Sequence, residues 1–61
     1  MNKEEYVKAI KKFLIENNKF TCEQAEELIE IYKDDIDELM NLGLSPDGAG
    51  TAMMMGYWYN K

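Results

Sequence analysis

The stretch from Thr21 to Leu44 constrains the fold most strongly, because it carries signals for both ends of a helix with an apolar stripe between them. Thr21 can cap the first turn while Gln24 reaches back to the Thr21 amide, which is the capping-box pattern. At the other end, Gly43 can adopt the left-handed conformation that terminates a helix. We therefore expect one long helix over Cys22–Leu42.

The apolar residues of this stretch recur at helical spacing and gather on one side of a helical wheel. They are Cys22, Ala25, Leu28, Ile29, Tyr32, Ile36, Leu39 and Met40. Such a stripe is expected to face the core. The only cysteine, Cys22, lies on the stripe, so we expect a small buried hydrophobic side chain rather than a reactive thiol. Ile31 and Leu42 lie off the stripe, where they would receive a second helix or remain exposed.

Two further helices are expected on either side of the long one. Asn2 and Glu5 form another capping-box pattern, and the apolar face that follows predicts a helix over Lys3–Glu16. A short polar connection then returns the chain antiparallel, as a helical hairpin. The Ser45-Pro46 pair marks the start of a third helix, predicted over Pro46–Tyr59 and packed across the hairpin.

These elements predict an all-α fold, a single three-helix domain over residues 1–61. A chain of this length buries only about 60% of the surface that its unfolded form exposes. With one cysteine and no histidine, an internal disulfide or a metal cannot supply the missing stability, so close helix packing or self-association must. The predicted core comprises Tyr6, Ile10, Phe13, Leu14, Phe20, Ala25, Leu28, Ile29, Tyr32, Ile36, Leu39, Leu44 and Ala52.

The composition argues against several classes of function. The net charge of −5, with seven lysines and no arginine, leaves little to bind a nucleic-acid backbone. No apolar run approaches the roughly 20 residues that span a bilayer, and the N-terminus lacks a signal-peptide pattern, so we expect a soluble cytoplasmic protein. There is no histidine and no serine or cysteine beside a candidate base, so we expect neither an enzyme nor a cofactor. The aspartates lack the glycine-containing loop of an EF-hand, so no metal site is expected.

The predicted C-terminal helix has no polar face. Gly48, Ala52 and Gly56 recur at intervals of four, with Ala49 alongside, which predicts a flat side for close approach to the hairpin. Apart from Asp47 near its start, the segment carries no charge before Lys61. A helix that is apolar all round is normally buried all round, yet a terminal helix in so small a domain should turn one side to water.

This conflict favours a binding surface on the C-terminal helix. Methionine adapts to irregular surfaces, and tyrosine and tryptophan are enriched at interface hot spots. We therefore expect a non-enzymatic protein-interaction module that binds another protein or a second copy of itself as a homodimer. The alternative is that Met53, Met55 and Tyr59 complete the protein's own core while Trp58 covers an edge. The candidate contact residues are Met53, Met54, Tyr57 and Trp58.

The polar side of the long helix is acidic, with seven carboxylates and Lys33 at its edge. The plain interpretation is a solvated helix face. The alternative is an inhibitor or decoy, for example one encoded by a phage, that mimics a nucleic-acid backbone and docks on a basic site of a host enzyme. The residues that would present this charge are Glu23, Glu27, Glu30 and Asp34.

The Leu-Gly-Leu-Ser-Pro sequence over residues 42–46, ahead of an alanine-containing helix, resembles turns in small helical modules, among them ubiquitin-associated domains. No binding residue is carried over from this resemblance. The short, acidic composition, in which lysine is the only basic residue, is also similar to that of accessory proteins from low-GC bacteria and their phages.

Overall fold

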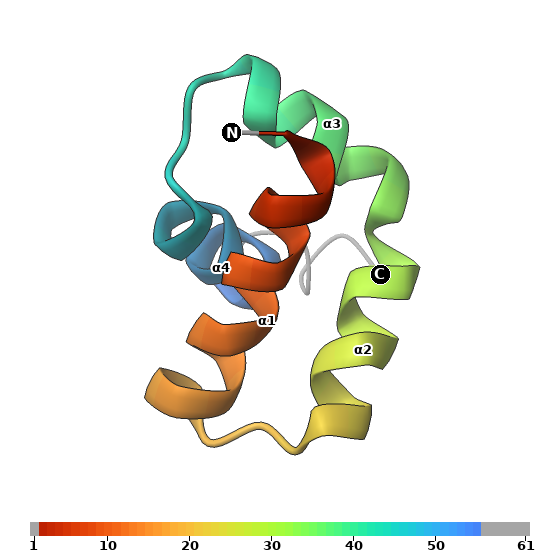
Figure 1. The fold of residues 1–61 in the computed structure, drawn as a ribbon, viewed down its shortest axis with the longest axis vertical. Coiled ribbons are helices and arrows are strands. Elements are labelled where there is room, and N and C mark those ends of the chain that lie inside the picture. Colours follow the sequence, from red (N-terminus) through yellow and green to blue (C-terminus); the bar gives the residue numbers. More distant parts are fainter. Residues whose placement is uncertain (1, 56–61) are drawn as a thin grey trace.

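The structure is a computed structural model that describes residues 2–55, and its regular elements are all helices. Helix α1 spans Lys3–Asn18, α2 spans Cys22–Ile31, α3 spans Lys33–Asn41 and α4 spans Pro46–Met55 (Figure 1). The predicted all-α class is confirmed over these residues. The three-helix arrangement is corrected, because the long middle helix is two helices.

The predicted helix over Cys22–Leu42 is interrupted at Tyr32. The Tyr32 N–H still donates to the Leu28 carbonyl at 3.1 Å, and the next helical bond runs from the Ile36 N–H to the Tyr32 carbonyl at 3.0 Å. Tyr32 itself has φ −106° and ψ 20°, outside the helical range. The chain therefore changes direction between α2 and α3 (Figure 1).

The bend at Tyr32 lets both halves of the apolar stripe reach the core. Helix α2 runs beside α1, whereas α3 lies across the N-terminal end of α1 (Figure 1). There Lys3 and Asp37 form an ion pair at 3.1 Å, and Ile36 and Leu39 are buried. A straight helix would continue past α1 and leave this end of the core uncovered.

The predicted helix starts are confirmed by hydrogen bonds. The Glu5 N–H donates to Asn2 Oδ1 at 2.8 Å, and the Gln24 N–H donates to Thr21 Oγ1 at 3.1 Å. Both capping boxes are complete, because each N-cap amide is also bonded by the Glu5 or Gln24 side chain. Helix α1 ends at Asn18, two residues later than predicted, and α3 ends at Asn41.

The core lies where α1 meets the other three helices. Eight of the predicted core residues are confirmed as buried, whereas Phe13, Phe20, Ile29 and Ala52 are only partly buried. Leu44 was predicted wrongly, since it is 38% exposed in the turn between α3 and α4. The buried apolar residues are Tyr6, Ile10, Leu14, Ala25, Leu28, Tyr32, Ile36, Leu39, Ala49 and Met53.

Cys22 was also predicted wrongly, because its side chain is exposed. It is the first residue of α2, directly after the connection from α1. Lys11 of α1 forms an ion pair with Glu26, and Glu26 lies one turn along α2 from Cys22. Cys22 therefore belongs to the apolar stripe in the sequence, but its side chain does not pack in the core.

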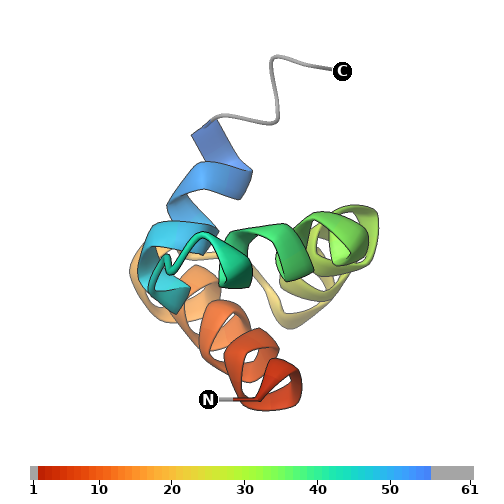
Figure 2. The same cartoon turned by 90° about the horizontal axis from the view of Figure 1, so that it is seen from above.

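Helix α4 packs mainly against α1, through a face that shares only Ala49 with the predicted small-residue side. Its buried residues are Ala49, Gly50 and Met53, whereas Gly48 and Ala52 are only partly buried. A Cβ atom at Gly50 would lie 2.7 Å from Phe13 Cδ2, so the two helices approach closely at this glycine. Figure 2 shows that α4 rises out of the layer formed by α1 and α2.

Candidate functional site

The predicted contact residues of the C-terminal helix divide into three groups. Met53 is fully buried in the core, so in this structure it is not available to a partner. Met54 is partly buried. Met55, which the alternative interpretation placed in the core, is instead 65% exposed at the end of α4. Tyr57 and Trp58, together with the last part of the predicted helix, lie outside the described residues.

The described residues also form an apolar hollow that sequence reasoning missed. It has a volume of about 300 Å³ and is lined by Phe20, Gln24, Glu27, Leu28 and Ile31. We call it the α2 hollow, because all but Phe20 come from α2 at the spacing of one helical face. Ile31 is 50% exposed. Its position off the main stripe was the only signal in the sequence for this surface.

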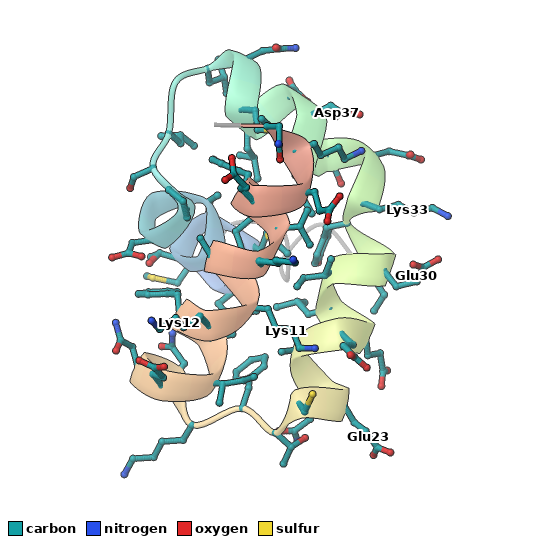
Figure 3. All side chains as sticks on the ribbon, in the orientation of Figure 1. Lys11, Lys12, Glu23, Glu30, Lys33 and Asp37 are labelled. Carbon is teal, nitrogen blue, oxygen red and sulfur yellow. The ribbon has the colours of Figure 1, made fainter. Side chains whose placement is uncertain are left out.

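The other flank of α2 faces a longer groove along the seam with α1. Val7 and Ile29 are among the residues that line this groove, and Lys11 on the α1 side pairs with Glu26 on the α2 side at 2.7 Å. Figure 3 shows Lys11 extending from α1 toward α2. Because the charges of this groove pair within the chain, it acts as a seam that holds the two helices together.

The Lys11–Glu26 pair shifts the titration of both groups. The hydrogen bond and charge of Lys11 lower the pKa of Glu26, and the hydrogen bond from Glu26 raises the pKa of Lys11. Cys22 lies beside this pair, with its Sγ atom 3.9 Å from Glu26 Oε2. The neighbouring Cys22 also favours the charged form of Lys11 and so raises its pKa further.

The predicted acidic residues are all exposed, but they do not share one helix. Glu23, Glu27 and Glu30 lie on α2 and Asp34 lies on α3, beyond the bend. Figure 3 shows Glu23 and Glu30 on the side of α2 away from α1. Glu30 pairs with Lys33 at 3.2 Å, whereas the other three form no ion pair within residues 2–55. We call these four residues the acidic surface.

Within the part of the chain that the structure describes, no three or more of the histidine, cysteine, aspartate and glutamate side chains are placed to hold a metal ion. No helix in the same part is both long enough and apolar enough to cross a bilayer.

No known protein family, curated protein or solved structure matches the chain. The candidate sites are therefore surfaces defined by their own chemistry. One is the apolar end of α4 together with the α2 hollow, and the other is the acidic surface.

Proposed function

We propose that this protein is a non-enzymatic interaction module that self-associates through residues 54–58. The observation that carries this proposal is the exposure of Met55, which is 65% accessible at the point where α4 leads into Gly56, Tyr57 and Trp58. Helix α4 already packs through Ala49, Gly50 and Met53, so the exposed Met55 side chain is apolar surface that this packing does not use.

The chemistry of residues 54–58 fits a contact between proteins. Methionine and aromatic side chains are enriched in the buried centres of interfaces, where charged residues are depleted. This stretch contains two methionines, a tyrosine and the only tryptophan, and no charged residue. A second copy is the simplest partner, because a two-fold dimer needs one self-complementary surface.

Sedimentation equilibrium over a wide concentration range tests the proposal. The wild-type mass should rise toward that of a dimer as the concentration increases. The Trp58→Ala variant should dimerise at least about tenfold more weakly, as expected for truncation of a hot-spot residue. Leu42→Ala is the matched control, because Leu42 is apolar and 68% exposed but lies at the end of α3. A mass that stays monomeric throughout would contradict the proposal.

A second candidate function is an acidic inhibitor or decoy that binds a basic protein through the acidic surface. What favours it is the distribution of charge, since α2 and α3 together carry eight of the twelve carboxylates and one of the seven lysines. Glu23, Glu27 and Asp34 keep their charge free of ion pairs within the described residues. Such a surface can attract a basic site over several ångströms.

Competition with duplex DNA for a basic DNA-binding protein tests this candidate. A decoy should displace the DNA at low salt, and replacing Glu23, Glu27 and Asp34 by lysine should abolish the displacement. The Trp58→Ala variant should displace DNA as the wild type does. A wild-type chain that leaves the DNA bound argues against the decoy and leaves the C-terminal surface as the candidate.

A further inference from the structure

We propose that the α2 hollow of one copy receives the Tyr57 and Trp58 side chains of a second copy. This inference rests on the proposed self-association and names the surface that accepts the C-terminal segment. Each chain then carries both a donor segment and an acceptor hollow, so two equivalent contacts can close a two-fold dimer.

The α2 hollow has the composition of a site for an aromatic side chain. Phe20, Leu28 and Ile31 supply apolar walls, and the Ile31 side chain is half exposed. Gln24 and Glu27 add polar atoms to the lining. An indole N–H or a phenol O–H can donate to such atoms while its ring packs on the apolar walls.

The direction of α4 favours a second copy over the same chain as the source of the segment. Helix α4 packs on α1 and α3 and rises out of the layer that α1 forms with α2 (Figure 2). The end of α4 at Met55 therefore stands out of the layer that contains the hollow, and it is open to the approach of a second copy.

The charges of donor and acceptor are complementary. The six residues after Met55 carry one charged side chain, that of Lys61. The acceptor helix presents Glu23 and Glu27, which form no ion pair within residues 2–55, and Glu27 also lines the hollow. A lysine that follows the aromatic residues can therefore meet a carboxylate beside the hollow, which favours this docking over other apolar surfaces.

An Ile31→Glu variant tests the site by sedimentation equilibrium of the full chain. Because Ile31 is exposed, the variant should keep the wild-type helix content by circular dichroism. It should dimerise at least about tenfold more weakly, because a carboxylate would be buried against the aromatic rings. Leu42→Glu is the matched control and should dimerise as the wild type does, since Leu42 is exposed outside the hollow.

Energy transfer tests whether the segment comes from a second copy. Trp58 is the only tryptophan and Cys22 the only cysteine, and Cys22 is exposed on the acceptor helix. A Trp58→Phe chain that carries at Cys22 a dye absorbing tryptophan emission is mixed with unlabelled wild-type chain. We expect Trp58 emission to be quenched in the mixture, and the quenching to be lost when the labelled chain also carries Ile31→Glu.

The outcomes separate the inference from the proposed function. If the wild-type chain stays monomeric, both the proposed self-association and the docking into the α2 hollow are ruled out. A dimer that Ile31→Glu leaves unchanged removes the inference and keeps the self-association. A mixture in which the mass shows a dimer but Trp58 emission is not quenched overturns the inference.

Discussion

At Gly50 the lack of a side chain determines how closely α4 lies against α1. A Cβ atom there would meet Phe13 Cδ2 at 2.7 Å and Cε2 at 3.1 Å, distances that require the ring or the helix to move. Gly48 is different, because its nearest neighbour would be Ser45 Oγ at an ordinary 3.4 Å. Close packing therefore requires glycine at position 50 but not at position 48.

A Gly50→Ala substitution should destabilise the fold by about 1–3 kcal/mol, the usual cost of overpacking. Gly48→Ala should be neutral or stabilising by up to about 1 kcal/mol, because alanine favours the helix. Urea unfolding followed by circular dichroism measures both free energies. Equal effects of the two substitutions would show that α4 does not contact Phe13 through Gly50.

The Lys11–Glu26 pair predicts a pH dependence. The folded pKa of Glu26 lies below its ordinary value of 4.5, so the folded state favours the charged carboxylate. The stabilisation is therefore complete above about pH 4.5 and is lost as the pH falls through the folded pKa. Glu26→Gln should lower the free energy of unfolding at pH 7, and the difference from the wild type should vanish in strong acid.

Denaturant unfolding of both chains between pH 2 and pH 7 measures this difference. Glu23→Gln is the matched control, because Glu23 lies on the same helix without an ion pair among the described residues. A difference for Glu26→Gln that stays constant over this range would mean that the pair does not stabilise the fold.

Individual residues also show why the sequence predicted the surface of α4 poorly. An amphipathic helix reveals its orientation through the phase of its apolar residues. Helix α4 is apolar on nearly every side, so its apolar residues do not single out one face. We had inferred the packed face from the small residues instead, and most of that face is not the one that packs. The contact between Gly50 and Phe13 instead buries Met53, which we had expected to contribute to a binding surface.

At the level of the elements, the sequence predicted where the helices begin better than where they change direction. The capping boxes at Asn2 and Thr21 were read correctly because each is a local pattern of a few residues. The break at Tyr32 was missed because the apolar stripe continues in phase through Ile36. The available signal was the aspartate pair at 34–35, which suits the first turn of a new helix.

The ends of α1 and α3 provide a test of these elements. Lys19 follows α1 with φ 59°, whereas Gly43 follows α3 with φ 81° and has open space around it. Left-handed backbone costs a residue with a side chain about 1–2 kcal/mol. Lys19→Gly should therefore stabilise the protein by about 1 kcal/mol and Gly43→Ala should destabilise it by a similar amount.

Thermal unfolding of the two variants checks these signs. Each change should shift the melting temperature by several degrees, because about 1 kcal/mol corresponds to roughly 4–8 °C in a domain of this size. A loss of stability in Lys19→Gly would contradict the left-handed ending of α1.

At the scale of the whole molecule, the acidic helices α2 and α3 pack against the more basic helix α1. Lys3 and Lys11 of α1 bind Asp37 and Glu26, and these pairs connect α1 to both α3 and α2. The remaining carboxylates of α2 and α3 repel one another, except that Glu30 is paired with Lys33. We therefore expect the repulsion among these carboxylates to outweigh the attraction of the ion pairs.

Moderate salt should therefore stabilise the protein. Raising the salt from about 10 mM to about 200 mM shortens the screening length and weakens the repulsion among exposed carboxylates. The melting temperature, measured at micromolar concentration, should rise by a few degrees. A decrease would mean that the exposed ion pairs outweigh the repulsion.

The candidate interface shows a limit of sequence reasoning at this scale. Methionine and aromatic residues near the C-terminus indicated a donor surface, because their composition alone is unusual. The acceptor was not predicted, since the α2 hollow forms only when Phe20, from the connection after α1, comes to lie beside Leu28 and Ile31. The lining residues all lie within residues 20–31, but they mix apolar with polar side chains, so no apolar pattern marks this surface in the sequence.

The emission of Trp58 as a function of protein concentration tests the central claim most directly. As the wild-type chain is concentrated from about 1 μM to about 1 mM, a range that spans weak and moderate affinities, the emission should shift to the blue. The shift should follow the increase in mass and should be weakened by Ile31→Glu. Emission that stays the same over the whole range would show that Trp58 does not enter a contact between chains, and would contradict the account.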